Sequence, residues 1–216
     1  MKSKIHKFPL IVKNKAMRTT LKIYSIKTLL FISFFTLLLT SACAKSGNNS
    51  NSKSAANTNT ESVVAKPKIN IHEAVLSGNL EAVKQHIAAQ TNINEKDAMS
   101  GSTPLISAAS FGKNEIAKVL IDAGADLAIK NNDGSTALHA AAFFCRIEIV
   151  QMLIDAKADK TIKNNFGATA RESVMGPFAE IKPIYEMLQL QLGPIGMNLD
   201  LNEIEKTRPV IAMMLQ

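Results

Sequence analysis

The residues that could carry chemistry in this sequence are two cysteines and a few histidines. Cys145 is followed by Arg146, whose positive charge favours a thiolate. His72 and Glu73 begin like the zinc-protease motif, but that motif needs a second histidine four residues after the first, where Leu76 stands. The sequence contains no Gly-x-Ser-x-Gly nucleophile elbow, no phosphate-binding loop and no dinucleotide-binding glycine motif. We therefore predict no enzyme and no catalytic, metal-binding or cofactor-binding residues; the alternative is a thiol-based redox or stress-response protein that uses Cys145.

The positive charge of the chain lies almost entirely in its first 42 residues. The whole sequence has 25 basic and 18 acidic residues, a net charge of +7. Residues 1–42 contain eight lysines and arginines and no acid, so the remainder has 25 − 8 = 17 basic and 18 acidic residues, or 17 − 18 = −1. A nucleic-acid-binding domain carries its basic patch on the folded part. We therefore predict no nucleic-acid partner.

A short apolar segment, Leu29–Thr40, follows the lysines of this basic region and precedes the small residues Ser41 and Ala42. It is too short to cross a bilayer, which needs about 20 residues. The order of basic, apolar and small residues is typical of a secretory signal peptide, which we assign to residues 1–42, with Met17 as an alternative start. The junction Leu39-Thr40-Ser41-Ala42-Cys43 resembles the lipobox of bacterial lipoproteins, in which the cysteine becomes the lipidated N-terminus.

That resemblance implies lipidation at Cys43 and contact with the membrane only through the lipid. Ala44 after the cysteine resembles the outer-membrane sorting choice, so we expect an outer-membrane lipoprotein facing the periplasm; an ordinary cleavage site would give a soluble periplasmic protein. Residues 43–68 are rich in serine, asparagine and alanine and cannot bury enough apolar area to form a core. We interpret them as a tether with a typical reach of about 25–30 Å.

Beyond the tether the sequence repeats with a fixed period. Gly101, Gly134 and Gly167 open similar segments, with spacings of 134 − 101 = 33 and 167 − 134 = 33. Val119–Asp126 and Met152–Asp159 are similar at the same offset. A period of this length predicts stacked supersecondary units that form a core only together.

The period and the motif Thr103-Pro104-Leu105 resemble the ankyrin repeat, as does Thr136-Ala137-Leu138-His139. The resemblance implies an all-α repeat solenoid: an ankyrin stack of about 3–4 helix-turn-helix units with short β-hairpin loops and a C-terminal helical cap. We place the units at about 69–98, 99–131, 132–164 and 165–192, and the cap at 193–216. His72 and His139 then occupy the histidine position, which the family uses for structural hydrogen bonds.

Three residues stand where this pattern has glycine: Gln90, Cys145 and Lys157. If the backbone is left-handed there, each costs on the order of 1 kcal/mol. The fourth unit lacks the Pro-Leu-His motif and is typical of a terminal repeat. In the cap we expect a helix from Glu203 to about Leu215, kinked or split at Pro209.

Ankyrin proteins generally bind other proteins through the hairpin tips and the exposed side of each first helix. The resemblance therefore assigns a partner-binding surface to eight residues: Met99, Ser107, Phe111, Asn131, Asn132, Phe143, Phe144 and Asn164. The three phenylalanines either form a partner-binding patch or pack between repeats or beneath the C-terminal segment. The function we expect is a protein–protein interaction module that binds, protects or inhibits an envelope or secreted protein.

Overall fold

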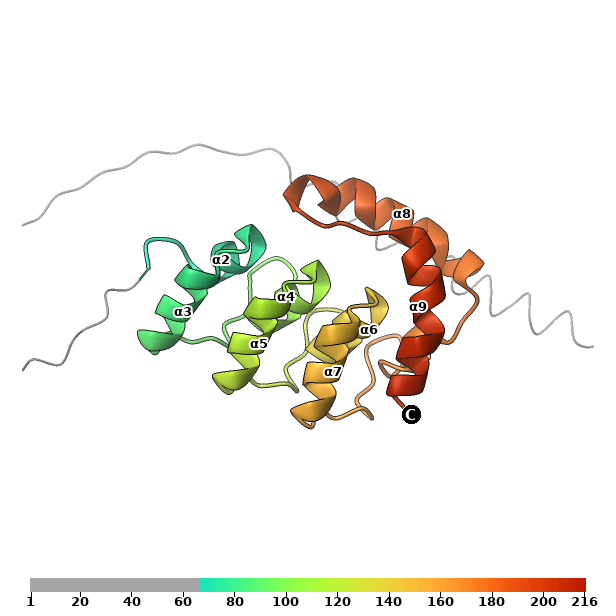
Figure 1. The fold of residues 1–216 in the computed structure, drawn as a ribbon, viewed down its shortest axis with the longest axis horizontal. Coiled ribbons are helices and arrows are strands. Elements are labelled where there is room, and N and C mark those ends of the chain that lie inside the picture. Colours follow the sequence, from blue (N-terminus) through green and yellow to red (C-terminus); the bar gives the residue numbers. More distant parts are fainter. Residues whose placement is uncertain (1–66) are drawn as a thin grey trace, which may run out of the picture. The chain divides into compact units, whose positions relative to one another are not determined.

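The computed structural model describes residues 67–216 and shows a row of paired helices (Figure 1). The predicted signal peptide and Cys43 lie outside the described residues. Three consecutive pairs have the same construction, a first helix followed within two or three residues by a second. Their bounds are Ile71–Ser77 (α2) with Leu80–Ala88 (α3), Pro104–Phe111 (α4) with Asn114–Asp122 (α5), and Ala137–Phe143 (α6) with Ile147–Asp155 (α7).

The first helices begin and end where the sequence supplies suitable caps. The Asn70 side chain accepts a hydrogen bond from the Glu73 amide, and the Thr103 hydroxyl accepts one from the Ile106 amide. Both interactions satisfy amides that the first turn of a helix leaves unpaired. Gly112 ends α4 in the left-handed conformation, with φ of 65°, which lets the chain reverse directly into α5.

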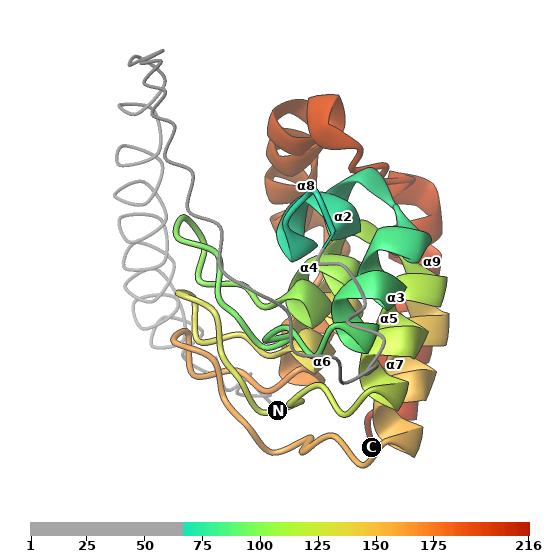
Figure 2. The ribbon, with the colours of Figure 1, turned by 90° about the vertical axis from the view of Figure 1, so that its left-hand side faces the viewer.

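The stack has two layers. Helices α2, α4 and α6 form an inner row, and α3, α5 and α7 form an outer row behind it (Figure 2). The pairs of small residues on the inner helices are completely buried, so neighbouring repeats approach closely: Ala74 and Val75, Ala108 and Ala109, Ala141 and Ala142. The aliphatic stripes of the outer helices pack against them. This is the predicted solenoid.

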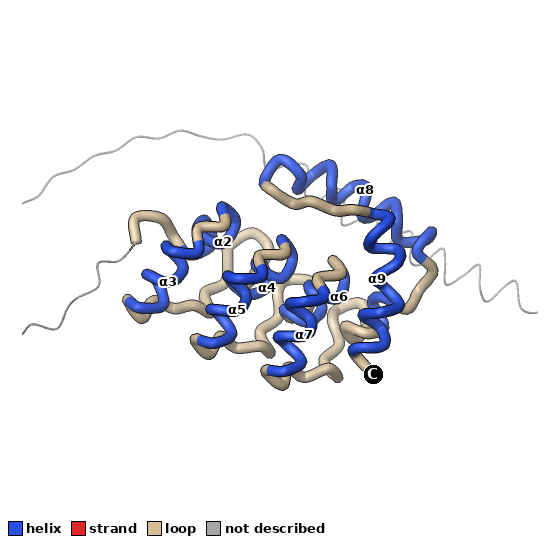
Figure 3. Tube along the Cα trace, in the orientation of Figure 1, coloured by secondary structure: helices blue, strands red, loops and turns tan. Residues whose placement is uncertain are grey.

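The connections between repeats are turns. The prediction of short β-hairpin loops is corrected in one respect: within residues 67–216 no strand is present, because the tips are closed by turn hydrogen bonds, such as that from the Gly134 amide to the Asn131 carbonyl, without a β-ladder (Figure 3). In the same part of the chain, no helix has the length and apolarity needed to cross a membrane.

Beyond the third pair the repeat geometry changes. A 3-10 turn, Glu172–Val174 (η1), takes the position of the next inner helix against α6. The 15-residue helix Phe178–Leu192 (α8) that follows belongs to neither row. A second 3-10 turn, Gly193–Ile195 (η2), comes after it and leads the chain back to the stack. Leu201–Met214 (α9) packs against α7 and η1, so it continues the outer row (Figure 1).

The expected helix of the C-terminal cap is present and is continuous through Pro209. It begins two residues earlier than predicted, at Leu201, because the Asp200 carboxylate accepts hydrogen bonds from the amides of Asn202 and Glu203. The expected backbone strain is also confirmed: Gln90, Cys145 and Lys157 have φ values of 52°, 53° and 64°.

Candidate protein-binding surface

The tips of the inter-repeat loops are fixed by side-chain acceptors that recur in each repeat. Asn131 Oδ1 accepts hydrogen bonds from the amides of Asp133 and Ser135, at 3.0 and 2.8 Å. Asn164 Oδ1 does the same one repeat later. Asn131 and Asn164, which the sequence suggested as partner contacts, therefore use their carbonyl oxygens to hold the turns.

Asp97 has the same position in the first of these loops. Its carboxylate accepts hydrogen bonds from the amides of Met99, Ser100 and Ser102 and from the Ser100 hydroxyl. Burial of the Asp97 carboxyl acts to raise its pKa, but these hydrogen bonds together outweigh that effect and lower the pKa below its usual value. The turn is therefore held by an ionised carboxylate at neutral pH.

A second set of hydrogen bonds connects each tip to the next. Asn132 donates from its side-chain amide to the Met99 carbonyl at 3.0 Å and from its backbone to the Ser100 carbonyl at 2.9 Å. Asn165 repeats both interactions with Asn132 and Asp133. The three tips therefore form one continuous, internally bonded edge of the stack.

Glycine is required on this edge at Gly134. Its φ is 72°, and a β-carbon there would overlap the side chain and backbone of Asn165. Because the position combines a left-handed backbone with close contact between repeats, only glycine fits without moving the tip.

Two apolar side chains project from this edge. Met99 is 78% exposed and lies at the first tip, and Phe166 is 55% exposed and lies at the third. Phe166 was not among the predicted contacts, although an aromatic residue beside Asn165 in a polar turn was a usable signal. Ser107 is half-buried on α4, and Asn132 is exposed although its amide is engaged with the preceding tip.

His139 performs the structural role expected of it. Its Nδ1 accepts from the Thr136 amide at 3.3 Å, and its Nε2 contacts the Ala168 carbonyl at 3.1 Å in the next loop. Burial lowers the pKa of His139, so the ring is neutral at pH 7. His72 does not share this arrangement, because both of its ring nitrogens lack a hydrogen-bond partner among the described residues. His86, which the sequence did not single out, instead connects Thr91 to the Ile69 carbonyl.

The three phenylalanines of the predicted patch lie beneath the C-terminal segment, which was the second alternative from the sequence. Phe111, Phe143 and Phe144 are half-buried and pack against a cluster formed by α8 and the segment that follows it. The ring of Tyr185 on α8 lies 4.9 Å from that of Phe143, measured between centroids. The interpretation of these rings as an open patch is therefore corrected: α8 covers them, and its residues Phe178, Ile181, Tyr185, Leu188 and Leu192 supply the apolar face.

A buried polar network fixes α8 in this position. The Tyr185 hydroxyl donates to the Phe143 carbonyl at 2.6 Å and accepts from Arg208 Nη1 at 3.1 Å. Arg208 is only 4% exposed and also donates to the Gly176 carbonyl at 3.0 Å. Within residues 67–216 no carboxylate forms a salt bridge with it. Burial raises the pKa of Tyr185 to about 12, so the hydroxyl remains a donor at neutral pH.

Cys145 lies at the edge of the same cluster. Burial raises its pKa to about 11, and this effect exceeds the opposing effects of the positive charges on Arg208 and Arg146. The expectation that Arg146 would activate the thiol is therefore corrected: Cys145 is protonated at neutral pH, and the thiolate that redox chemistry needs is disfavoured. Across the described residues, no three His, Cys, Asp or Glu side chains are grouped so that they could hold a metal ion.

Comparison with known proteins agrees with this architecture. Residues 71–164 match the family model "Ankyrin repeats (3 copies)". Over 63 residues the chain is 48% identical to "Protein phosphatase 1 regulatory subunit 27" of Homo sapiens, covering 29% of this chain and 40% of that protein; the Mus musculus protein matches equally. "DNA-binding protein RFXANK" of Homo sapiens is 36% identical over 58 residues, covering 27% of this chain and 22% of that protein.

The chain therefore spans less than half the length of these relatives. Among solved structures, the ankyrin repeat domain of Bcl-3, of the IkappaB protein family, matches with a TM-score of 0.46 and 28% sequence identity. That match covers 48% of this chain and 45% of the other.

Proposed function

Residues 71–164 are an array of three ankyrin repeats, and from this premise we propose that the chain is a non-catalytic protein-binding module whose contact surface is the edge formed by the loop tips. Ankyrin repeats serve protein–protein interaction, and stacked repeats offer an extended surface that one partner can cover. A fold alone names no partner. The binding surface therefore has to be identified from the side chains that the stack leaves exposed.

The observation that carries this proposal is the contrast between the two ends of the inner helices. At one end α8 covers the aromatic residues Phe111, Phe143 and Phe144. At the other end the tips are held rigid by bonds between repeats, while Met99 and Phe166 remain exposed. A backbone edge that is already held in place before binding avoids the entropic cost of ordering the loops, which favours affinity.

We propose further that lipid attached to Cys43 anchors the chain to the outer membrane, with the repeats facing the periplasm. The support is the sequence alone: the basic and apolar leader, the junction before Cys43 and the polar residues 44–68. The module would then bind, protect or inhibit an envelope or secreted protein. Replacing Cys43 with serine should abolish labelling by a fatty-acid probe; retained labelling would refute the anchor.

Affinity capture from envelope extract tests the binding proposal. The bait is the full chain, and the test variant carries Met99→Asp and Phe166→Asp at the tips. The matched control carries Leu190→Asp and Met213→Asp, because these apolar side chains are 80% and 60% exposed but lie on α8 and α9.

We expect one protein to be enriched by the wild type and the control and lost with the tip variant. Enrichment that is lost with the control and kept by the tip variant would move the binding surface to the C-terminal helices. Capture of nothing by folded wild type would contradict the proposed function.

A further inference from the structure

A column of lysines follows the same edge of the stack. Lys96, Lys130 and Lys163 occupy equivalent positions, at spacings of 130 − 96 = 34 and 163 − 130 = 33 residues. Each is exposed and directly precedes the residue that holds its tip turn, which is Asp97, Asn131 or Asn164. The repeat architecture therefore places one ammonium group per repeat along the edge.

Within residues 67–216 none of these three ammonium groups forms a salt bridge. The salt bridges among residues 67–216 are Lys118–Asp122 and Lys182–Glu186, on other helices. Lys130 donates to the Lys163 carbonyl at 2.9 Å, which holds its amine between two neighbouring loops. The positive charge of Lys130 also contributes to the lowered pKa of His139, after the larger effect of burial.

The spacing of the column fits an extended chain. Packed helices are about 8–10 Å apart, and neighbouring repeats are related by such a step. A chain in the extended polyproline II conformation rises about 3.1 Å per residue with three residues per turn, so every third side chain lies on the same side and advances by about 9 Å. A carboxylate at every third residue of such a chain would therefore face one lysine in each repeat.

We infer that the column binds an extended acidic segment of the partner protein, with carboxylates three residues apart and apolar residues beyond them that contact Met99 and Phe166. The inference rests on the proposed function and adds the chemistry of the partner. Opposite charges along an interface steer association and set the register of the bound chain. The two apolar side chains come from the first and third tips, so they lie toward the two ends of the column.

An anionic membrane or a nucleic acid fits these observations less well. Residues 67–216 have 14 basic and 17 acidic side chains, a net charge of 14 − 17 = −3. A surface for polyanions needs a dominant positive field, whereas the described residues carry a net negative charge and the column has one lysine per repeat. Exposed apolar side chains at the tips favour a polypeptide over a phosphate backbone.

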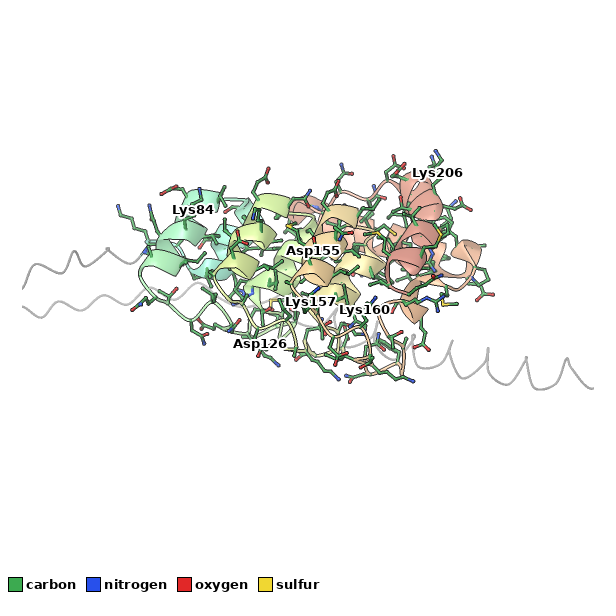
Figure 4. All side chains as sticks on the ribbon, turned by 60° about the horizontal axis from the view of Figure 1, so that its bottom comes forward. Lys84, Asp126, Asp155, Lys157, Lys160 and Lys206 are labelled. Atoms are coloured by element: carbon green, nitrogen blue, oxygen red, sulfur yellow. The ribbon has the colours of Figure 1, made fainter. Side chains whose placement is uncertain are left out.

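The test is peptide binding by the full chain in detergent, measured by fluorescence anisotropy. The probe is a labelled peptide of about ten residues with glutamate at every third position, the period of a polyproline II chain. The test variant carries Lys96→Gln, Lys130→Gln and Lys163→Gln. The control, Lys84→Gln with Lys157→Gln and Lys206→Gln, removes the same charge from exposed positions on or just after the outer helices (Figure 4). Gln90 already occupies the position equivalent to Lys157, so the control tolerates glutamine there.

We expect the lysine-column variant to bind about tenfold more weakly than the wild type, because it loses three ion pairs. The effect is not larger because each of these exposed pairs contributes little. The control should bind within about twofold of the wild type, and binding should weaken as salt increases. A peptide of the same composition with adjacent glutamates should bind more weakly than the spaced one.

Equal loss in both variants, or equal binding of the two peptides, would show only general charge attraction and overturn the inference. Binding of phosphatidylglycerol vesicles through the column, without binding of the spaced peptide, would also overturn it. Capture from envelope extract separates the two proposals: a protein retained equally by wild type and the lysine-column variant refutes the inference and leaves the proposed function standing.

Discussion

Replacing Tyr185 with phenylalanine removes one oxygen atom from the contact between α8 and the repeats. The hydroxyl is fully buried, donates to the Phe143 carbonyl at 2.6 Å and accepts from Arg208 Nη1 at 3.1 Å. Without it, a carbonyl and a cationic N–H lose their partners in a site closed to water. Each unpaired buried group costs about 1–3 kcal/mol. We therefore expect Tyr185→Phe to lower the free energy of unfolding by about 2–3 kcal/mol in urea titrations followed by circular dichroism.

A double-mutant cycle separates this network from simple packing. Arg208→Met keeps much of the side-chain volume but removes the charge. If the two side chains act through their hydrogen bond, the double variant loses less stability than the sum of the single variants, by about 1–2 kcal/mol. A loss below about 0.5 kcal/mol for Tyr185→Phe, or strict additivity in the cycle, would refute the idea that this network holds α8 over the aromatic residues.

Three further predictions concern the backbone, the thiol and the loop carboxylate. Lys157→Gly should raise the free energy of unfolding by about 0.5–1 kcal/mol in urea titrations, because relief of the left-handed strain exceeds the entropy that glycine adds to the unfolded chain; a loss would contradict the strain argument. Alkylation of Cys145 by iodoacetamide in the folded chain should stay slow at pH 8 and accelerate only as the pH approaches the raised pKa of about 11; rapid labelling at pH 7 would show an activated thiol. The pKa of Asp97 is lowered on folding, so the stabilisation by its carboxylate is present above the unfolded-state pKa and is lost as the pH falls through the folded-state pKa. Asp97→Asn should therefore reduce the loss of stability in acid. An unchanged dependence of stability on pH would refute this role.

The sequence predicted the repeats well because their cause is local and repeated. The 33-residue glycine spacing marks equivalent turns, and a turn of fixed geometry recurs wherever the same backbone is needed. The same logic identified the left-handed conformation of Gln90, Cys145 and Lys157, because each replaces a glycine of the pattern. The role of His139 followed from its position in the motif.

The position of α8 could not be predicted in this way. Its apolar side chains recur at helical spacing, but that pattern does not say which distant surface they cover. The expected order, with a fourth helix pair followed by a separate cap, differs from the structure, in which α9 continues the outer row and α8 crosses to the aromatic residues. Asn131 and Asn164 were suggested as contacts because tips are exposed, whereas their hydrogen bonds to backbone amides became visible only in the folded turn.

The central claim is that the edge of loop tips is the binding surface, and the affinity of the captured partner tests it most directly. The dissociation constant would be measured by calorimetry for the wild type, the Met99→Asp and Phe166→Asp variant, and the Leu190→Asp and Met213→Asp control. Loss of two apolar contacts should weaken binding by tenfold or more in the tip variant and leave the control within about twofold. An unchanged dissociation constant in the tip variant, with a weakened control, would contradict the account and place the interface on α8 and α9.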